Sequence, residues 1–294
     1  MPSAGALVLG VLAALLFGNP YVARTRVLTP LLLQLSVAGL GAGIDLAIVA
    51  RAGVKGFGYT VVGISLTLAT GLLIGRLLGT PRDTSTLITV GTAICGGSAI
   101  AAVAPTIRAR EAEVSISLAT VFLLNAVGLV VFPPIGRFFH LGQTEFGLFA
   151  ALAIHDTSSV VGAALQYGKQ ALEVATTVKL ARALWIVPLA LAIGALRARE
   201  GGEAGEAKVK KPWFILGFVA LSALVTWMPA LQPAGALLAG GARRALVVTL
   251  FLIGSGLTRK ALASVGVRPL VQGVLLWLVT ASATLGAILA GIVK

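Results

Sequence analysis

The sequence predicts an all-α polytopic membrane protein with about ten transmembrane helices. Three observations predict it: 57% of the 294 residues are hydrophobic, only 11% are charged, and the mean hydropathy is +0.99. An ordinary soluble domain is about a quarter charged, so a water-soluble protein of this size could not cover its surface with so few charges. A disulfide-stabilised secreted domain is also excluded, because Cys95 is the single cysteine. We therefore expect a multi-pass protein of the cell (inner) membrane.

The net charge of +13 does not point to nucleic acid. The basic residues stand singly or in pairs between apolar segments, a pattern typical of helix ends held at lipid headgroups. A basic stripe interleaved with aromatic residues, which favours nucleic-acid binding, is missing from the sequence. The lipid bilayer is the expected partner.

A helix needs about 20 apolar residues to cross a bilayer, and the apolar runs divide at proline, glycine and charge clusters. Asn19-Pro20 stops the first run and Pro133-Pro134 closes the fifth. The ten expected spans are residues 4–18, 29–49, 57–78, 84–107, 114–132, 146–167, 174–196, 213–228, 245–257 and 270–293. Residues 197–211 hold three glutamates, five basic residues and three glycines, which predicts a solvated loop. This loop joins two helical groups of a single transmembrane domain, residues 1–294.

Two gapless internal matches suggest repeats. Gly41–Lys55 resembles Gly254–Arg268 at an offset of 254 − 41 = 213 residues, and Ala93–Val114 resembles Ala153–Val174 at an offset of 155 − 95 = 60. Seven spans separate the first pair, so those copies would be inverted, as in many secondary transporters. The second pair lies two spans apart and would be parallel if both segments cross fully. Either one of these segments is re-entrant or one match is accidental.

The run Cys95-Gly96-Gly97-Ser98 interrupts the fourth expected span. Inside hydrocarbon, a helix break is tolerated only where it is buried in protein or lines a cavity. Paired glycines let the backbone approach a ligand closely, and the half-helix that follows would point its free N–H groups at the break. We interpret this run as part of an anion site; close packing of small residues between helices is the alternative.

A second polar run, His155-Asp156-Thr157-Ser158-Ser159, lies within the sixth expected span. An aspartate at the centre of a membrane costs about 2.5–3.5 kcal/mol on insertion scales, so these residues are expected to face a polar interior. His155 titrates near neutral pH and Asp156 can accept a proton or coordinate a cation. The alternative is a loop at the membrane surface.

Lys179 and Arg182 are three residues apart in the seventh expected span, which places them on one face of a helix. If they face the interior they need anionic partners, either Asp156 or a negatively charged substrate. If they lie near the helix end, they reach the headgroups instead. Asn125, in the middle of the fifth span, is a candidate for binding a coupling ion or proton, or for holding helices together.

These residues resemble the YeiH-like putative sulfate exporters, a family of bacterial membrane proteins. The resemblance covers nearly the whole chain and is most specific at Ile94-Cys95-Gly96, His155-Asp156 and Lys179–Arg182, and at Gly254–Thr258. It implies relatedness to the bile-acid, arsenite and riboflavin transporters and to the cation–proton antiporters. From that group it implies inverted repeats, interrupted crossing or re-entrant helices, a core with a scaffold (panel) domain, and often a homodimer.

The expected function is secondary active transport of a small anion of the sulfate, sulfite or organosulfonate class, coupled to H⁺ or Na⁺. The expected substrate-binding residues are Cys95, Gly96, Gly97, Ser98, His155, Asp156, Thr157, Ser158, Ser159, Lys179 and Arg182, with His155, Asp156 and Asn125 for the coupling ion. We expect no cofactor, no metal site and no enzyme activity. One alternative is a cation–proton (Na⁺/H⁺) antiporter in which the two basic residues are counter-ions to Asp156. Another is a membrane-embedded hydrolase built on Ser98 or His155.

Overall fold

Every regular element of the described chain is a helix. The structure is a computed structural model that describes residues 3–199, 213–256 and 266–293. The helices are α1 (Ser3–Phe17), α2 (Val22–Leu40), η1 (Gly41–Gly43), α3 (Leu46–Leu77), α4 (Arg82–Ala93), α5 (Gly97–Thr106), α6 (Glu111–Phe138), α7 (Gln143–Ala153), α8 (Thr157–Tyr167), α9 (Lys169–Ala183), α10 (Ile186–Arg199), α11 (Trp213–Trp227), η2 (Pro229–Leu231), α12 (Gln232–Ser255) and α14 (Val267–Leu289). The all-α prediction is confirmed for these residues.

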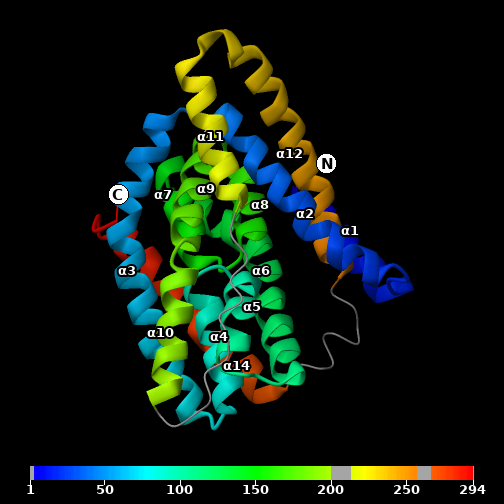
Figure 1. Cartoon of the computed structure of the whole chain (residues 1–294), viewed down its shortest axis with the longest axis vertical. Coiled ribbons are helices and arrows are strands. Elements are labelled where there is room, and N and C mark those ends of the chain that lie inside the picture. The colour runs from blue at the N-terminus through cyan, green and yellow to red at the C-terminus, as the bar shows by residue number, and fades with distance from the viewer. Residues whose placement is uncertain (1–2, 200–212, 257–265, 294) are drawn as a thin grey trace.

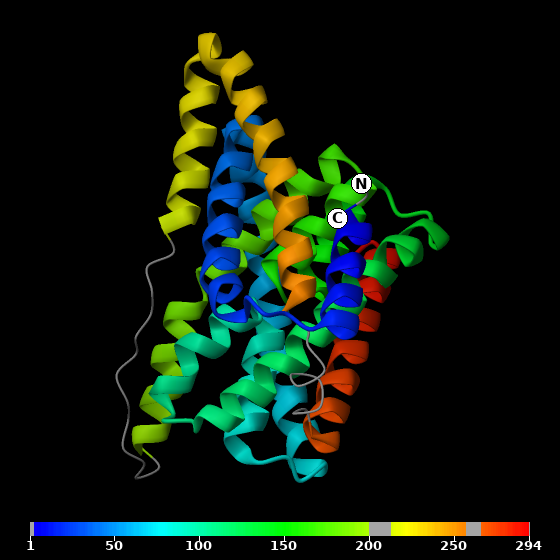
Figure 2. The same cartoon turned by 90° about the vertical axis from the view of Figure 1, so that its right-hand side faces the viewer.

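The helices pack as two groups (Figures 1 and 2). In the first group, which we call the panel, α1 and α2 pack on α12, and α11 packs on α2. The second group, the core, holds α3 to α10 and α14. The two groups meet mainly where α8 of the core contacts α1 and α12 of the panel. One half of an interrupted segment therefore lies at the boundary between core and panel.

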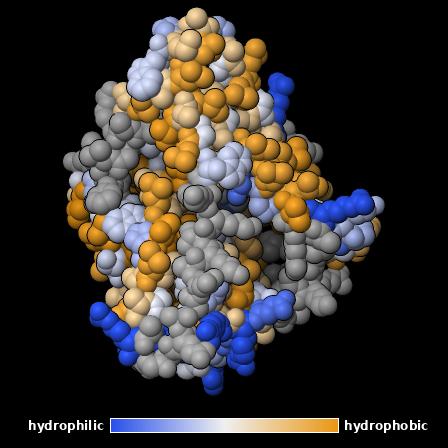
Figure 3. All heavy atoms as spheres, in the orientation of Figure 1, coloured by the Kyte–Doolittle hydropathy of each residue, from blue (hydrophilic) through white to orange (hydrophobic). Residues whose placement is uncertain are grey.

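Five stretches of the described chain are long and apolar enough to cross a membrane: residues 58–77, 111–138, 169–197, 229–255 and 267–289. Shorter apolar helices accompany them, so the expected ten full spans are not confirmed. Large apolar side chains are nevertheless exposed, among them Leu216, Trp227 and Leu237 of the α11–α12 pair. Figure 3 shows hydrophobic residues over wide areas of the visible face, with hydrophilic residues gathered at its lower edge. Such a surface suits lipid as the surrounding solvent.

The segment of α7 and α8 turns back instead of crossing the molecule. The hydroxyl of Tyr167, at the end of α8, donates to the carbonyl of Leu141, just before α7, at 2.6 Å. The Tyr167 ring stacks on Phe146 with 3.8 Å between ring centroids. The entry and the exit of this segment therefore lie side by side, which makes α7 and α8 a re-entrant hairpin.

The segment of α4 and α5 turns back in the same way, with both of its ends beside the last turns of α10. Asp83, at the start of α4, pairs with Arg197 of α10 at 2.7 Å. A Cβ on Gly194 of α10 would lie 3.5 Å from Cβ of Thr106, at the end of α5. Figure 1 shows this hairpin in the lower half of the molecule and α7 and α8 in the upper half. The long helix α6 connects the two hairpins.

The two hairpins follow the 60-residue match. Adding 60 to the bounds of α4, residues 82–93, gives 142–153, and α7 spans 143–153. Adding 60 to the bounds of α5, residues 97–106, gives 157–166, and α8 spans 157–167. Since both segments are re-entrant, the conflict over parallel copies disappears. For the 213-residue match, residues 257–265 lie outside the described residues.

Several expected boundaries were wrong. The second span ends at Leu40, and Asp45 begins α3 instead, where its Oδ1 accepts a hydrogen bond from the backbone N–H of Ala47 at 2.6 Å. The ninth span begins earlier, because α12 starts at Gln232 and carries Arg243 and Arg244 within the helix. The first three residues of the expected loop 197–211 continue α10, and the rest lie outside the described residues. In each case the apolar pattern continued past, or stopped short of, the actual helix end.

Glycines bring the backbones of α1 and α12 into direct contact. A Cβ on Gly254 of α12 would overlap the carbonyl of Leu7 and lie 2.9 Å from the backbone nitrogen of Val11. A Cβ on Gly10 would in turn overlap the carbonyl of Phe251. Small residues at such crossings are how membrane helices associate without a hydrophobic driving force.

Replacing Gly254 by alanine is expected to destabilise the panel, because the added methyl group has no room. Overpacking costs typically about 1–3 kcal/mol. Gly241 lies on the same helix with nothing within 4 Å of an added Cβ, so Gly241→Ala should leave stability unchanged or raised. The melting temperature (Tm) of the purified protein in detergent measures both variants. Equal Tm values for the two would contradict this packing.

Candidate functional site

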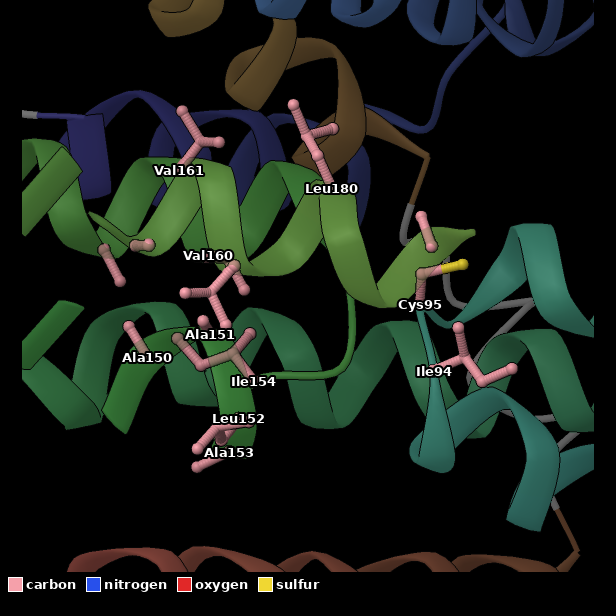
Figure 4. Packing of buried hydrophobic residues seen from close by; sticks show 14 of the residues in the cluster. Ile94, Cys95, Ala150, Ala151, Leu152, Ala153, Ile154, Val160, Val161 and Leu180 are labelled. Carbon is pink, nitrogen blue, oxygen red and sulfur yellow. The ribbon is translucent and has the colours of Figure 1, made fainter. Parts of the chain in front are cut away.

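The turns of the two hairpins meet inside the core. The first turn, Ile94–Gly96, follows α4, and the second, Ile154–Asp156, follows α7. A Cβ on Gly96 would lie 2.9 Å from the backbone oxygen of His155. Gly96 also has φ +64° and ψ −122°, a conformation available to glycine and strained for other residues. Figure 4 shows Ile94 and Cys95 on the first turn and Ile154 at the end of α7.

Asn125 of α6 joins the two turns. Its Oδ1 accepts a hydrogen bond from the backbone N–H of His155 at 2.9 Å. Its Nδ2 lies 3.6 Å from the position that a Cβ on Gly96 would take, and it is buried with no hydrogen-bond partner in the structure. The whole residue is 1% exposed. Asn125 therefore holds the second turn with its oxygen and leaves two N–H donors unused beside the first.

Lys179 and Arg182 of α9 are both buried and bind backbone carbonyls of both hairpins. Lys179 Nζ donates to the oxygen of Ile154 at 2.8 Å and to that of Ala151 at 3.3 Å. Arg182 Nε donates to the oxygen of Ala93 at 2.8 Å, and its Nη1 donates to that of Leu152 at 3.0 Å. Arg182 thus links the end of α4 to the end of α7.

These contacts have a physical reason. The last carbonyls of a helix have no partner within it, and the negative end of the helix dipole lies there. Each hairpin buries such an end in the core, where water cannot satisfy it. Ammonium and guanidinium groups supply both hydrogen bonds and positive charge at these ends. We expected Asp156 or a substrate to pair with these cations, but in the described chain no carboxylate lies within 4 Å of either.

Asp156 instead caps α8. One oxygen of its carboxylate accepts hydrogen bonds from the hydroxyl of Ser158, from the backbone N–H of Ser159 at 3.0 Å and from the hydroxyl of Ser159 at 3.1 Å. Aspartate at the N-cap satisfies free N–H groups and favours the positive end of the dipole. Thr157, Ser158 and Ser159 are buried in this first turn of α8, and Asp156 remains partly exposed.

The N-terminus of α5 carries no such carboxylate. No side chain of the described residues caps α5 at Gly96, and the thiol of Cys95 is a weak acceptor that faces the N–H of Ala99. Gly97 is partly exposed and Ser98 is exposed. The first N–H groups of α5 are therefore the more open of the two half-helix ends.

His155 turns away from the two cations. Its side chain is 2% exposed, and Nε2 lies 3.4 Å from Oγ1 of Thr280 on α14. Thr280 was missed by sequence reasoning because a single threonine in an apolar span is common. No group of three or more metal-ligating side chains occurs in the described residues.

The structure thus brings Cys95, Gly96, His155, Asp156, Lys179, Arg182 and Asn125 to one place where the two turns meet. Ser158 and Ser159 serve the cap of α8, and Ser98 lies at the exposed edge. The carbonyls that receive the cations could not be found from sequence, since every residue type carries one.

Arg182→Met is expected to lower the Tm strongly, because it leaves two buried carbonyls without their donors. Hydrogen bonds to charged groups contribute about 1.5–3 kcal/mol each. Arg244 of α12 is exposed, so Arg244→Met removes the same charge without this loss and should shift the Tm little. A Tm for Arg182→Met equal to that of Arg244→Met would show that these bonds do not hold the hairpins.

Comparison with known proteins places the chain in a family. The model of the family described as Conserved hypothetical protein 698 matches residues 1–273. A UPF0324 membrane protein of Bdellovibrio bacteriovorus is 64% identical over 98% of this chain and 89% of its own length. UPF0324 membrane proteins of Geobacter sulfurreducens and Bacteroides thetaiotaomicron are each 46% identical, over 97% and 96% of this chain and 90% and 85% of their own. No solved structure matches the chain. The chain belongs to the Conserved hypothetical protein 698 family, whose relatives are UPF0324 membrane proteins.

Proposed function

We propose that the protein is a secondary active transporter of a small anion and not an enzyme. The observation that carries this proposal is the set of unused hydrogen-bond donors where the two hairpin turns meet. Asn125 Nδ2 is buried without an acceptor, and it lies beside the N-terminus of α5. A buried donor without a partner costs about 1–3 kcal/mol. A bound anion would satisfy it.

The two half-helix ends divide the chemistry of this site. Helix N-termini bind anions through free N–H groups and the helix dipole. The N-terminus of α8 already holds the carboxylate of Asp156, so it would repel a second negative group. The N-terminus of α5 has no carboxylate, and its first residues, Gly97 and Ser98, are the accessible ones. We therefore place the anion at α5, between Ser98 and Asn125.

The arrangement of the hairpins supports transport through alternating access. Many transporters bind substrate near the middle of the membrane, where interrupted helices of inverted repeats meet. Here α6 separates the hairpins, they occupy opposite halves of the molecule, and their bounds match at an offset of 60 residues. We propose that α4–α5 and α7–α8 form such an inverted pair, reachable from one side of the membrane each.

The boundary between panel and core is suited to sliding. A small apolar cluster of Leu7 and Leu250 from the panel with Ala126 and Leu129 from α6 lies there. Apolar contacts are non-directional, so they can be exchanged for similar ones when the core moves. A core that moves against a fixed panel is also what the family resemblance implies.

The resemblance to sulfate exporters directs the choice of substrate. We propose sulfate, sulfite or an organosulfonate, since each presents several oxygen acceptors to converging N–H donors. The proposed location is the inner membrane, as a homodimer. A cation–proton antiporter would need Asp156 free to exchange ions with Lys179 or Arg182, but this carboxylate caps α8 instead.

Asn125→Asp tests the proposal directly. Aspartate keeps the oxygen that accepts from His155, but it replaces the free N–H donors with negative charge. We expect uptake of labelled sulfate, sulfite or taurine into proteoliposomes to fall at least about tenfold, since a hydrogen bond to a charged group is worth about 1.5–3 kcal/mol.

Gln34→Glu is the matched control. Its side-chain oxygen accepts a hydrogen bond from Nε1 of Trp213 at 2.9 Å in the panel, so glutamate keeps that contact and adds the same charge elsewhere. Uptake should persist in this variant. Undiminished anion uptake by Asn125→Asp would reject the site, and absence of uptake of any tested anion by the unaltered protein would reject the function.

A further inference from the structure

The ends of the hairpin helices also bear on which cation drives transport. In secondary transporters, the C-terminal ends of half-helices and unwound backbone carbonyls coordinate the coupling Na⁺. In this protein, the corresponding carbonyls of α7 are already occupied. Lys179 Nζ lies 2.8 Å from the oxygen of Ile154 and 3.3 Å from that of Ala151, and Arg182 holds the oxygen of Leu152.

We propose that the ammonium group of Lys179 takes the place of a coupling Na⁺, so that the protein works without sodium and Lys179 carries the coupled proton. This inference rests on the proposed transport function. It moves the coupling role away from His155, Asp156 and Asn125, which the sequence had favoured for it.

Lys179 suits this role better than the ionisable groups around it. Arg182 does not release its proton in proteins. Asp156 is held by three hydrogen bonds at the start of α8, and His155 faces Thr280 of α14.

Lys179 can also change its charge without losing its contacts. A neutral amine still carries two N–H bonds, enough for both carbonyls that the ammonium group now holds. The proton would leave to water on one side of the membrane and return from the other, one for each cycle.

The charges that face Lys179 come from three directions in the described chain. Arg182 lies on the same helix, Cys95 on the turn of α4–α5, and His155 and Asp156 on the turn of α7–α8. A bound anion beside α5 would add negative charge to this group and favour the protonated amine. Release of the anion would favour loss of the proton. The two events are therefore coupled through charge.

The first test measures the Tm of the full-length protein in detergent while sodium chloride replaces choline chloride at constant ionic strength. The unaltered protein should show the same Tm in both salts. Lys179→Ser empties the position and exposes the carbonyls, so we expect a lower Tm in choline that sodium partly restores. Lys179→Gln fills the position with a neutral donor and should not respond to sodium.

A sodium-dependent Tm of the unaltered protein would overturn the inference, as would a folded Lys179→Ser variant that sodium does not stabilise. If Lys179→Ser fails to fold, the unaltered protein and Lys179→Gln still decide. The second test drives labelled sulfate uptake into proteoliposomes with either a sodium gradient or a pH gradient. We expect the pH gradient alone to drive uptake.

Uptake driven by sodium would overturn the inference and leave anion transport standing. Uptake driven by neither gradient, with no exchange of labelled anion, would instead count against the proposed function. The role of Lys179 at the carbonyls would then be decided by the Tm measurements alone.

Discussion

The rest of the core depends on two buried cations that bind the backbone ends of interrupted helices. Ending a helix inside the membrane exposes carbonyls that neither water nor the next turn can satisfy. Lys179 and Arg182 meet this requirement for both hairpins from a single helix, α9. Arg182 suits the link between α4 and α7 because its guanidinium presents donors in a fixed planar fork.

This constraint explains why the two polar turns differ. The C-terminal ends of α4 and α7 receive cations, and the N-terminus of α8 receives its own carboxylate. The N-terminus of α5 has neither, although Asn125 places a free amide group beside it. A protein that satisfies three of four buried helix ends with its own side chains leaves the fourth for something else. Its positive dipole makes an anion the suitable occupant.

Much of this arrangement could be predicted from the sequence. Glycines and polar residues within apolar runs located both breaks, since such residues are costly in hydrocarbon without a purpose. The membrane environment followed from composition alone. The direction of the two segments could not be predicted, because half-helices of 10–12 residues fit a crossing or a re-entrant path equally well. The 60-residue match implied that at least one segment was re-entrant, and the structure shows two.

The partners of Lys179 and Arg182 were beyond prediction for a different reason. Sequence reasoning looks for carboxylates to balance buried cations, and Asp156 was the obvious candidate. Backbone carbonyls carry no sequence signature, so their role emerges only when the ends of α4 and α7 are placed beside α9. The same holds for Gly10 and Gly254, whose function is visible only through the backbone that touches them.

Hydrogen–deuterium exchange of the hairpin turns tests the central claim most directly. If Arg182 holds both turns through their carbonyls, Arg182→Met should speed amide exchange in residues 90–99 and 150–159 together, because opening of either turn exposes both. Exchange in the α1–α12 contact should remain unchanged. Unaltered exchange in both turns, or acceleration spread evenly over the whole chain, would contradict this account of how the core is held.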